Sequence, residues 1–181
     1  MNKYISIFFC VQIIALNLFA MQPKVTPVDY VRPQIDTHKS RWFFFSSASR
    51  PFGMVSLSPD TWTEGSWNSG YLYNSKEIRC FSHVHCWQLA GVPVMPTTGE
   101  VKGHKGMDAY KSTYSHETEI VKPGYHKVEL DTYQIRVELT STSRVGMHRY
   151  TYPAGEKANV LFDVGALLAH GKTEKAAIHR I

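Results

Sequence analysis

The segment Gln134-Ile-Arg-Val-Glu-Leu-Thr140 alternates apolar and polar residues along its whole length. Successive side chains of a β-strand point to opposite faces of the sheet, so Ile135, Val137 and Leu139 are expected on one buried face. The charged residues between them are expected to face solvent. This pattern is typical of a half-buried strand in an antiparallel sheet, and it indicates the fold class of the chain.

Other short runs extend the pattern on both sides. Tyr125–Leu130 and residues 145–152 flank the first segment across short polar turns, which predicts an antiparallel meander. The apolar run at residues 158–164 predicts a strand buried on both faces. Residues 51–59 are expected to hold a short strand between two prolines, and residues 91–96 a strand that its prolines confine to an edge or a bulge. Many short strands without sustained helical periodicity predict an all-β, two-layered antiparallel β-sandwich, with a barrel as the related alternative.

The composition fits a single globular domain. The chain has 181 residues, of which 43% are hydrophobic, 13% are aromatic and 19% are charged. This balance argues against a disordered or coiled-coil protein. The formal net charge is +5, but the basic residues alternate with acidic ones. A nucleic-acid-binding surface would need clustered cations, so no nucleic-acid partner is expected.

The first twenty residues have the pattern of a secretory signal peptide. Lys3 gives a positive start, and residues 4–20 carry no charge. Cleavage is expected near Ala20, which leaves residues 21–181 as one periplasmic or secreted domain that makes no membrane contact. An uncleaved membrane anchor is the alternative, although the apolar stretch is shorter than the roughly 20 residues that a span requires.

Cys80 and Cys86 remain after this cleavage, and export favours a disulfide between them. However, residues 78–87 are expected to form a strand, in which six residues span about 20 Å. A disulfide requires Cα atoms within about 7 Å. We therefore expect two free thiols on one buried face of this strand.

The opposite face of the same strand is expected to carry Phe81, His83, His85 and Trp87. Imidazoles can hydrogen-bond hydroxyl groups and an indole can stack on an apolar ring face, and sugars present both features. Two alternatives remain open. The His-x-His pair can bind zinc or copper if a further ligand joins it, or both histidines can be hydrogen-bonded structural residues of a packed sheet.

A polar loop at residues 60–71 precedes this strand. It contains three aromatic residues among Gly, Ser and Asn, namely Trp62, Trp67 and Tyr71. Aromatic rings in turn-forming sequence are typical of recognition sites, and capping of the sheet end is the structural alternative. Asp60 and Glu64 could also form a glycosidase acid and base pair. Asp60 is better interpreted as a turn residue that bonds its own backbone.

A series of blocks in chain order resembles the N-terminal domain of glycoside hydrolase family 92, which contains bacterial exo-acting α-mannosidases. The blocks are Pro51-Phe-Gly-Met54, Leu57-Ser-Pro-Asp60, Gly70-Tyr71, Phe81-Ser-His-Val-His85, Pro123-Gly-Tyr125, Glu138-Leu-Thr140, Arg144-Val-Gly146, His148-Arg-Tyr150 and Asn159-Val160. They extend from about Val28 to the end of the chain. The complete set of blocks in this order is more specific for the family than any single block.

The resemblance implies a galactose-mutarotase-like supersandwich, joined in the family to a larger C-terminal (α/α)6 barrel. It also implies inverting, calcium-dependent hydrolysis of α-mannosides at a site between the two domains. The general acid, the general base and most calcium ligands belong to the barrel, which is expected to be missing because the chain breaks off within the fold. No catalytic residue and no metal ligand are therefore expected here, and the chain alone is expected to be inactive.

The expected partners are an α-mannoside or related oligosaccharide and the missing barrel. The family blocks imply sugar contacts at Trp67, Tyr71, His83 and His85, and the loop composition adds Trp62. The chain departs from the family pattern at residues 36–45 and 86–91. In these segments His38, Arg41 and Trp87 are expected to border the sugar site as substitutes. A free-standing carbohydrate-binding module and a nonfunctional fragment are the alternative interpretations.

Overall fold

The computed structural model describes residues 24–38, 47–64, 70–85, 89–166, 174–177 and 179. The predicted signal peptide lies outside these residues, and so do Arg41, Trp67, Cys86 and Trp87. Among the helices that are described, none is long and apolar enough to cross a membrane.

The chain divides into two compact units, Met1–Val31 and Arg32–Ile181. The described part of the first unit holds a short 3-10 helix, η1 (Pro27–Tyr30), whose first turn is capped by Thr26 and Asp29. The described part of the second unit consists of short strands with two brief helical turns.

The strands of the second unit follow one another closely along the chain. They are β1 (Ala48–Ser49), β2 (Ser56–Asp60), β3 (Glu77–Ile78), β4 (Cys80–Ser82), β5 (Val84–His85), β6 (Leu89–Ala90), β7 (Val94–Thr98), β8 (Ser112–Thr113), β9 (Ile120–Lys122), β10 (Tyr125–Leu130), β11 (Ile135–Ser141), β12 (Gly146–Thr151) and β13 (Ala158–Phe162). The helical turns are η2 (Gly103–Lys105) and α2 (Met107–Tyr110).

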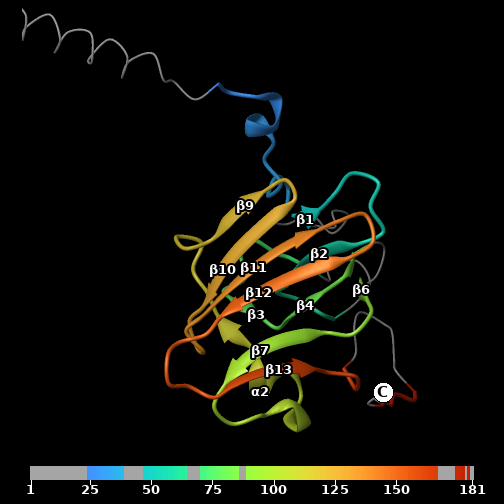
Figure 1. Ribbon diagram of the computed structural model, residues 1–181, viewed down its shortest axis with the longest axis vertical. Coiled ribbons are helices and arrows are strands. Elements are labelled where there is room, and N and C mark those ends of the chain that lie inside the picture. The colour runs from blue at the N-terminus through green and yellow to red at the C-terminus, as the bar shows by residue number, and fades with distance from the viewer. Residues whose placement is uncertain are drawn as a thin grey trace, which may run out of the picture. The chain divides into compact units, whose positions relative to one another are not determined.

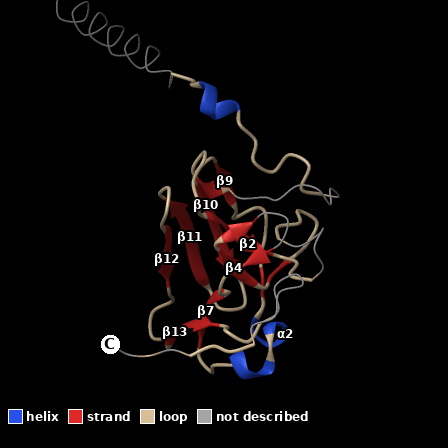
Figure 2. Ribbon diagram, turned by 90° about the vertical axis from the view of Figure 1, so that its right-hand side faces the viewer, coloured by secondary structure: helices blue, strands red, loops and turns tan. Residues whose placement is uncertain are grey.

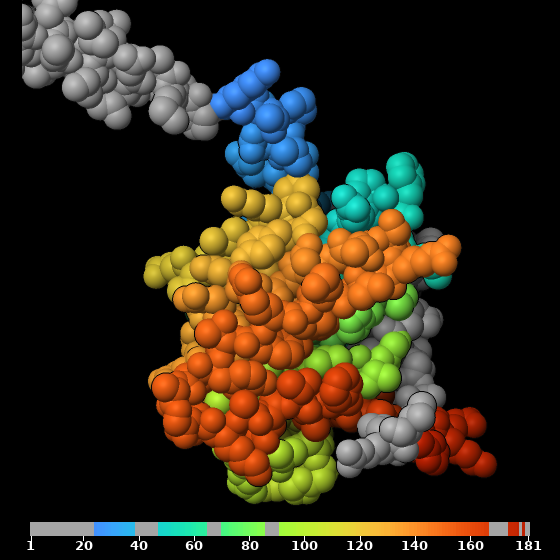
Figure 3. All heavy atoms as spheres, in the orientation of Figure 1, coloured from blue at the N-terminus to red at the C-terminus, as the bar shows by residue number. Residues whose placement is uncertain are grey.

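Two antiparallel sheets form the layers of the unit. One has the strand order β1-β2-β4-β7-β13 and the other β12-β11-β10-β9, and β3 with β8 and β5 with β6 form two small ribbons. The four-stranded sheet lies in front of the other in Figure 1, and the view turned by 90° separates the two layers (Figure 2). In Figure 3 the residues of β9–β12 cover much of the front surface. The predicted all-β sandwich is thus confirmed.

The hydrophobic core lies between the two sheets. Ile135, Val137 and Leu139 of β11 are buried, and they belong to one cluster with Leu57 and Phe81 of the five-stranded sheet. β11 pairs with β10 on one side and β12 on the other, as the predicted meander requires. Burial of each of these side chains stabilises the fold by roughly 1.5–3 kcal/mol.

The proline-containing strands differ from the predictions. β2 includes Pro59 instead of ending before it, and Pro59 pairs with Phe81 of β4. β7 includes Pro96 and lies between β4 and β13, so of the predicted edge or bulge the edge position is wrong. The pairing with β4 is limited to Phe81 and Val94, which spares Pro96 from donating a hydrogen bond there.

The predicted burial of residues 158–164 on both faces is also wrong. β13 is the last strand of its sheet, and the described residues give it a partner only in β7. Val160 is 44% exposed and Phe162 is 55% exposed. The apolar run therefore places hydrophobic side chains on the surface, and Phe162 and Val164 border an open cavity.

Candidate functional site

A buried carboxylate stands at the end of β2. The Oδ1 atom of Asp60 lies 2.6 Å from Nε2 of His85, and its Oδ2 atom accepts a hydrogen bond from the Cys80 thiol at 3.4 Å. Asp60 is fully buried, and a buried carboxylate is costly unless it is paired. The prediction that Asp60 is a turn residue is therefore wrong, because β2 continues to this position and carries the carboxylate into the interior.

This environment sets the protonation of the neighbouring groups. Burial alone would disfavour a charged imidazole, but the Asp60 carboxylate and the backbone carbonyl of Ser56 together raise the pKa of His85 above its usual value. Burial, reinforced by the charge of Asp60, raises the pKa of Cys80 well above its usual range. Cys80 is consequently a neutral thiol, and its predicted free state is confirmed.

His83 and His85 enter different surroundings. The backbone bends at His83, between β4 and β5, so the strict alternation of a single strand ends there. His85 turns toward Asp60, beside Cys80, whereas His83 lies against β12 of the other sheet. The predicted shared face of the two histidines is wrong, because it assumed one unbroken strand over residues 78–87.

The partner of His83 is a histidine far away in the sequence. Nε2 of His83 lies 3.0 Å from Nε2 of His148 on β12, and Nδ1 of His148 lies 2.8 Å from the hydroxyl of Tyr150. The ring of Phe81 meets the His148 ring edge to face. The two imidazoles thus join the five-stranded sheet to β12.

The absence of a side chain at Gly146 permits this contact. A Cβ atom added there would lie 2.6 Å from Cδ2 of His83, which is closer than real Cβ contacts. Both imidazoles are neutral at pH 7, because burial lowers the pKa of His148 to about 4 and also lowers that of His83. The neighbouring charge of His85 lowers the pKa of His83 further.

Tyr71 belongs to a second buried network and is not an exposed ring. Its hydroxyl donates to Oε2 of Glu119 at 2.9 Å. The same oxygen lies 2.6 Å from Nδ1 of His116, and Oε1 of Glu119 lies 2.9 Å from Nε2 of His126. Although burial opposes ionisation, these polar neighbours lower the pKa of Glu119 below its usual value. The network fixes the chain just after the aromatic loop.

The aromatic loop is closed at its base. Trp62 and Gly70 form a bridge, and the backbone amide of Thr61 also donates to the Gly70 carbonyl. The indole of Trp62 is 37% exposed, and the guanidinium carbon of Arg79 lies 5.3 Å from its centroid. The predicted contact Trp62 is therefore on the surface, held from one side by a cation.

The remaining predicted contacts are not brought together in the described residues. His38 is exposed at the end of the turn that begins the second unit, while Arg41, Trp67 and Trp87 lie outside the described part of the chain. His148 and Glu119 were not singled out from the sequence. The family block His148-Arg-Tyr150 pointed to His148. Nothing local in the sequence shows which distant residues His148 and Glu119 contact.

The described residues do not offer a calcium site. No three His, Cys, Asp or Glu side chains among them gather into a group that could hold a metal ion. The two buried carboxylates, Asp60 and Glu119, are each engaged by imidazoles and an O–H or S–H group. Calcium takes six to eight oxygen ligands, which such engaged carboxylates do not supply.

Comparison with known proteins identifies the family. The model of the glycosyl hydrolase family 92 N-terminal domain matches residues 30–180. A family 92 α-mannosidase of Bacteroides thetaiotaomicron, solved in complex with mannoimidazole, is 37% identical with a TM-score of 0.63, over 70% of this chain and 18% of the enzyme. A family 92 inverting mannosidase of Bacteroides thetaiotaomicron VPI-5482 is 27% identical with a TM-score of 0.66, over 77% of this chain and 20% of the enzyme. Comparison with curated proteins gives no match.

The chain thus spans about one fifth of the length of these solved enzymes. The matched region begins in η1 and covers both sheets of the sandwich. Sequence match and structural likeness agree on the same segment, and the chain belongs to glycoside hydrolase family 92, whose N-terminal domain it carries.

Proposed function

We propose that this domain forms one wall of the saccharide site of an exported α-mannosidase-like glycoside hydrolase. The observation that carries the proposal is the placement of His83 at the margin of the sandwich. Its imidazole lines an open cavity of about 630 Å³ together with Val92 and Phe162. A polar ring beside apolar surface matches a sugar, which presents hydroxyl groups at its edge and C–H groups on its face.

The proposed contacts fall into two groups. His83 and Trp62 reach the surface and would touch the saccharide directly. Tyr71 and His85 are buried, and they would support the site by fixing the chain beside the aromatic loop and below the bend at His83. Trp67, Trp87, His38 and Arg41 remain proposed direct contacts, on the basis of the sequence.

The proposed chemistry is inverting hydrolysis with acid and base supplied by another domain. Such a reaction needs one carboxylic acid to protonate the leaving oxygen and one carboxylate to activate water, about 6.5–9.5 Å apart. Asp60 and Glu119 cannot serve readily, because both are buried and paired with imidazoles. We therefore assign the acid, the base and the calcium site to the helical barrel domain that the family resemblance implies.

Binding of a mannoside to the chain tests this proposal. Isothermal titration calorimetry with α-1,2-mannobiose should show weak binding that His83→Ala reduces at least about fivefold, a loss of roughly 1 kcal/mol expected for one hydrogen bond. His104→Ala is the matched control, since His104 is an exposed histidine on η2. Release of mannose from the same ligand should not occur.

Two results would contradict the proposal. Turnover of mannobiose by the chain would place the acid and base within it. Binding that survives His83→Ala unchanged would remove His83 from the saccharide site.

A further inference from the structure

We propose that His83 and His148 form a binding site for a divalent transition-metal ion of the Cu²⁺ or Ni²⁺ type, which would join the two sheets of the sandwich. The site shares His83 with the proposed saccharide wall but does not rest on that proposal, and it involves no calcium. It uses the contact between β12 and the bend that follows β4, where two imidazole nitrogens face each other.

The distance between the two nitrogens fits chelation. They lie 3.0 Å apart, with the ring centroids 4.9 Å apart and the ring planes tilted by 46°. At a metal–nitrogen distance of about 2.0–2.1 Å, this separation gives an angle at the metal of roughly 91–97°. That angle is close to the right angle of square-planar and octahedral complexes, which Cu²⁺ and Ni²⁺ prefer, and is smaller than the tetrahedral angle that structural zinc sites use.

The surroundings orient the His148 ring for this role. The Tyr150 hydroxyl lies 2.8 Å from Nδ1 and can accept its proton, which leaves a lone pair on Nε2 of His148. Without a metal this lone pair accepts the Nε2–H of His83, so metal binding would require His83 to carry its proton on Nδ1 instead. Phe81 packs against the same ring from the core side. Gly146 leaves room for His83 to reach it. Metal-bound histidines typically have a partner of this kind on the second ring nitrogen.

A further feature favours a metal at this position. The cavity of about 630 Å³ beside His83 leaves space for water to complete the coordination of the ion. Imidazole nitrogen suits transition metals, whereas Ca²⁺ takes oxygen ligands and is not expected here.

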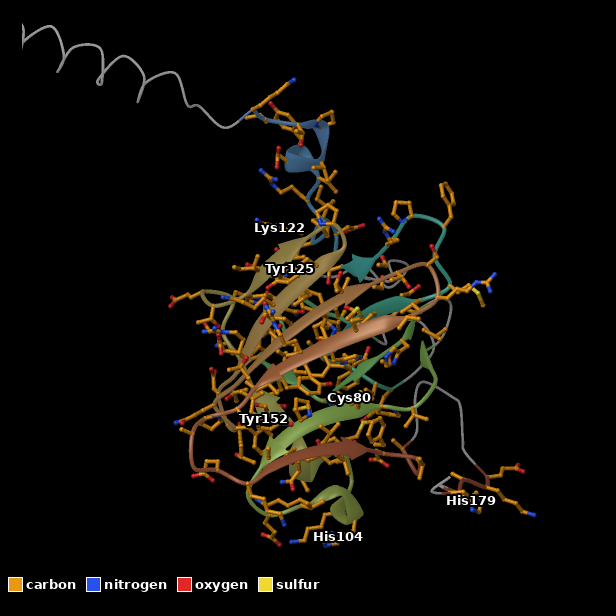
Figure 4. All side chains as sticks on the ribbon, viewed as in Figure 1. Cys80, His104, Lys122, Tyr125, Tyr152 and His179 are labelled. Atoms are coloured by element: carbon orange, nitrogen blue, oxygen red, sulfur yellow. The ribbon has the colours of Figure 1, made fainter. Side chains whose placement is uncertain are left out.

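Nickel titration of the full chain, purified without a histidine tag, tests the site. Calorimetry at pH 7.5 should show one tight Ni²⁺ per chain, and the midpoint of thermal unfolding should rise with Ni²⁺ concentration because the ion binds only the folded form. His83→Ala and His148→Ala should each weaken this binding at least about tenfold, and Tyr150→Phe should weaken it about tenfold. His104→Ala should not change the affinity for Ni²⁺, because His104 belongs to η2, at the lower edge of Figure 4, and is not one of the two proposed ligands.

Nuclear magnetic resonance of the unmutated chain keeps the test decisive if a variant does not fold. Paramagnetic Ni²⁺ should broaden the ring signals of His83 and His148 before those of His104 and His179. Ca²⁺ should leave all of them unchanged. The proposal is overturned if the first Ni²⁺ broadens other histidines, if its affinity is unchanged in His83→Ala, or if no Ni²⁺ binds.

Discussion

Replacing His148 with glutamine is expected to make the chain less sensitive to acid. Glutamine can keep hydrogen bonds toward His83 and Tyr150, but it does not titrate. In the parent chain, burial and the neighbouring His83 lower the pKa of His148 to about 4. The unfolded chain binds this proton near pH 6.5, so the folded form loses stability as the pH falls below about 6.5, and the loss is complete near pH 4.

The size of this effect follows from the two pKa values. At pH 5 the His148 side chain is mostly protonated in the unfolded form and mostly neutral in the folded form. The free energy of unfolding is therefore about 1.8 kcal/mol lower at pH 5 than at pH 7. His148 keeps some contact with solvent, which weakens the effect to about 1–2 kcal/mol. The parent should therefore lose about 1–2 kcal/mol more than His148→Gln between pH 7 and pH 5.

Urea unfolding followed by tryptophan fluorescence measures this difference. Both chains should be unfolded at pH 7, 6 and 5, with the free energy of unfolding taken from the midpoint and the slope. His104→Gln, which removes an exposed histidine, should follow the parent at every pH. Equal losses in the parent and in His148→Gln would refute the reasoning, because they would show that His148 is not held neutral by the fold.

Two other substitutions test the buried groups. Asp60→Ala should lower the free energy of unfolding by about 3–5 kcal/mol because it removes one partner of the buried Asp60–His85 pair, whereas Glu156→Ala on the surface should change it by less than about 0.5 kcal/mol in the same urea assay. Gly146→Ala should cost about 1–3 kcal/mol because its methyl group would displace His83, whereas Gly165→Ala meets no atom closer than 3.7 Å and should cost little in thermal unfolding. Equal effects within either pair would contradict the assigned contacts.

The meander was predictable because its signal is local. The alternation along residues 134–140 records which side chains are buried, and polar turns on both sides fix antiparallel neighbours. The same logic failed for β13, since a continuous apolar run does not reveal whether a strand lies inside a sheet or at its edge. Prolines were also misleading, because Pro59 and Pro96 both lie within strands; at Pro96 the pairing between β7 and β4 is too short to need its hydrogen bond.

The candidate site was less predictable because it depends on contacts between distant residues. The alternation of side chains along a strand predicted that His83 and His85 share one face. A single bend instead brings His85 to Asp60 and His83 to His148. His148 lies 65 residues beyond His83 in the chain, and Glu119 lies 48 residues beyond Tyr71. Separations of this length leave no local pattern in the sequence from which the contacts could be predicted.

Nuclear magnetic resonance of the histidine rings during addition of methyl α-mannoside tests the proposed saccharide wall most directly, because His83 lines its cavity. The proton signals of the His83 ring should shift with increasing ligand, while those of His104 and His179 stay fixed. Unmoved His83 signals at a ligand concentration that shifts other residues would show that the sugar binds elsewhere on the domain.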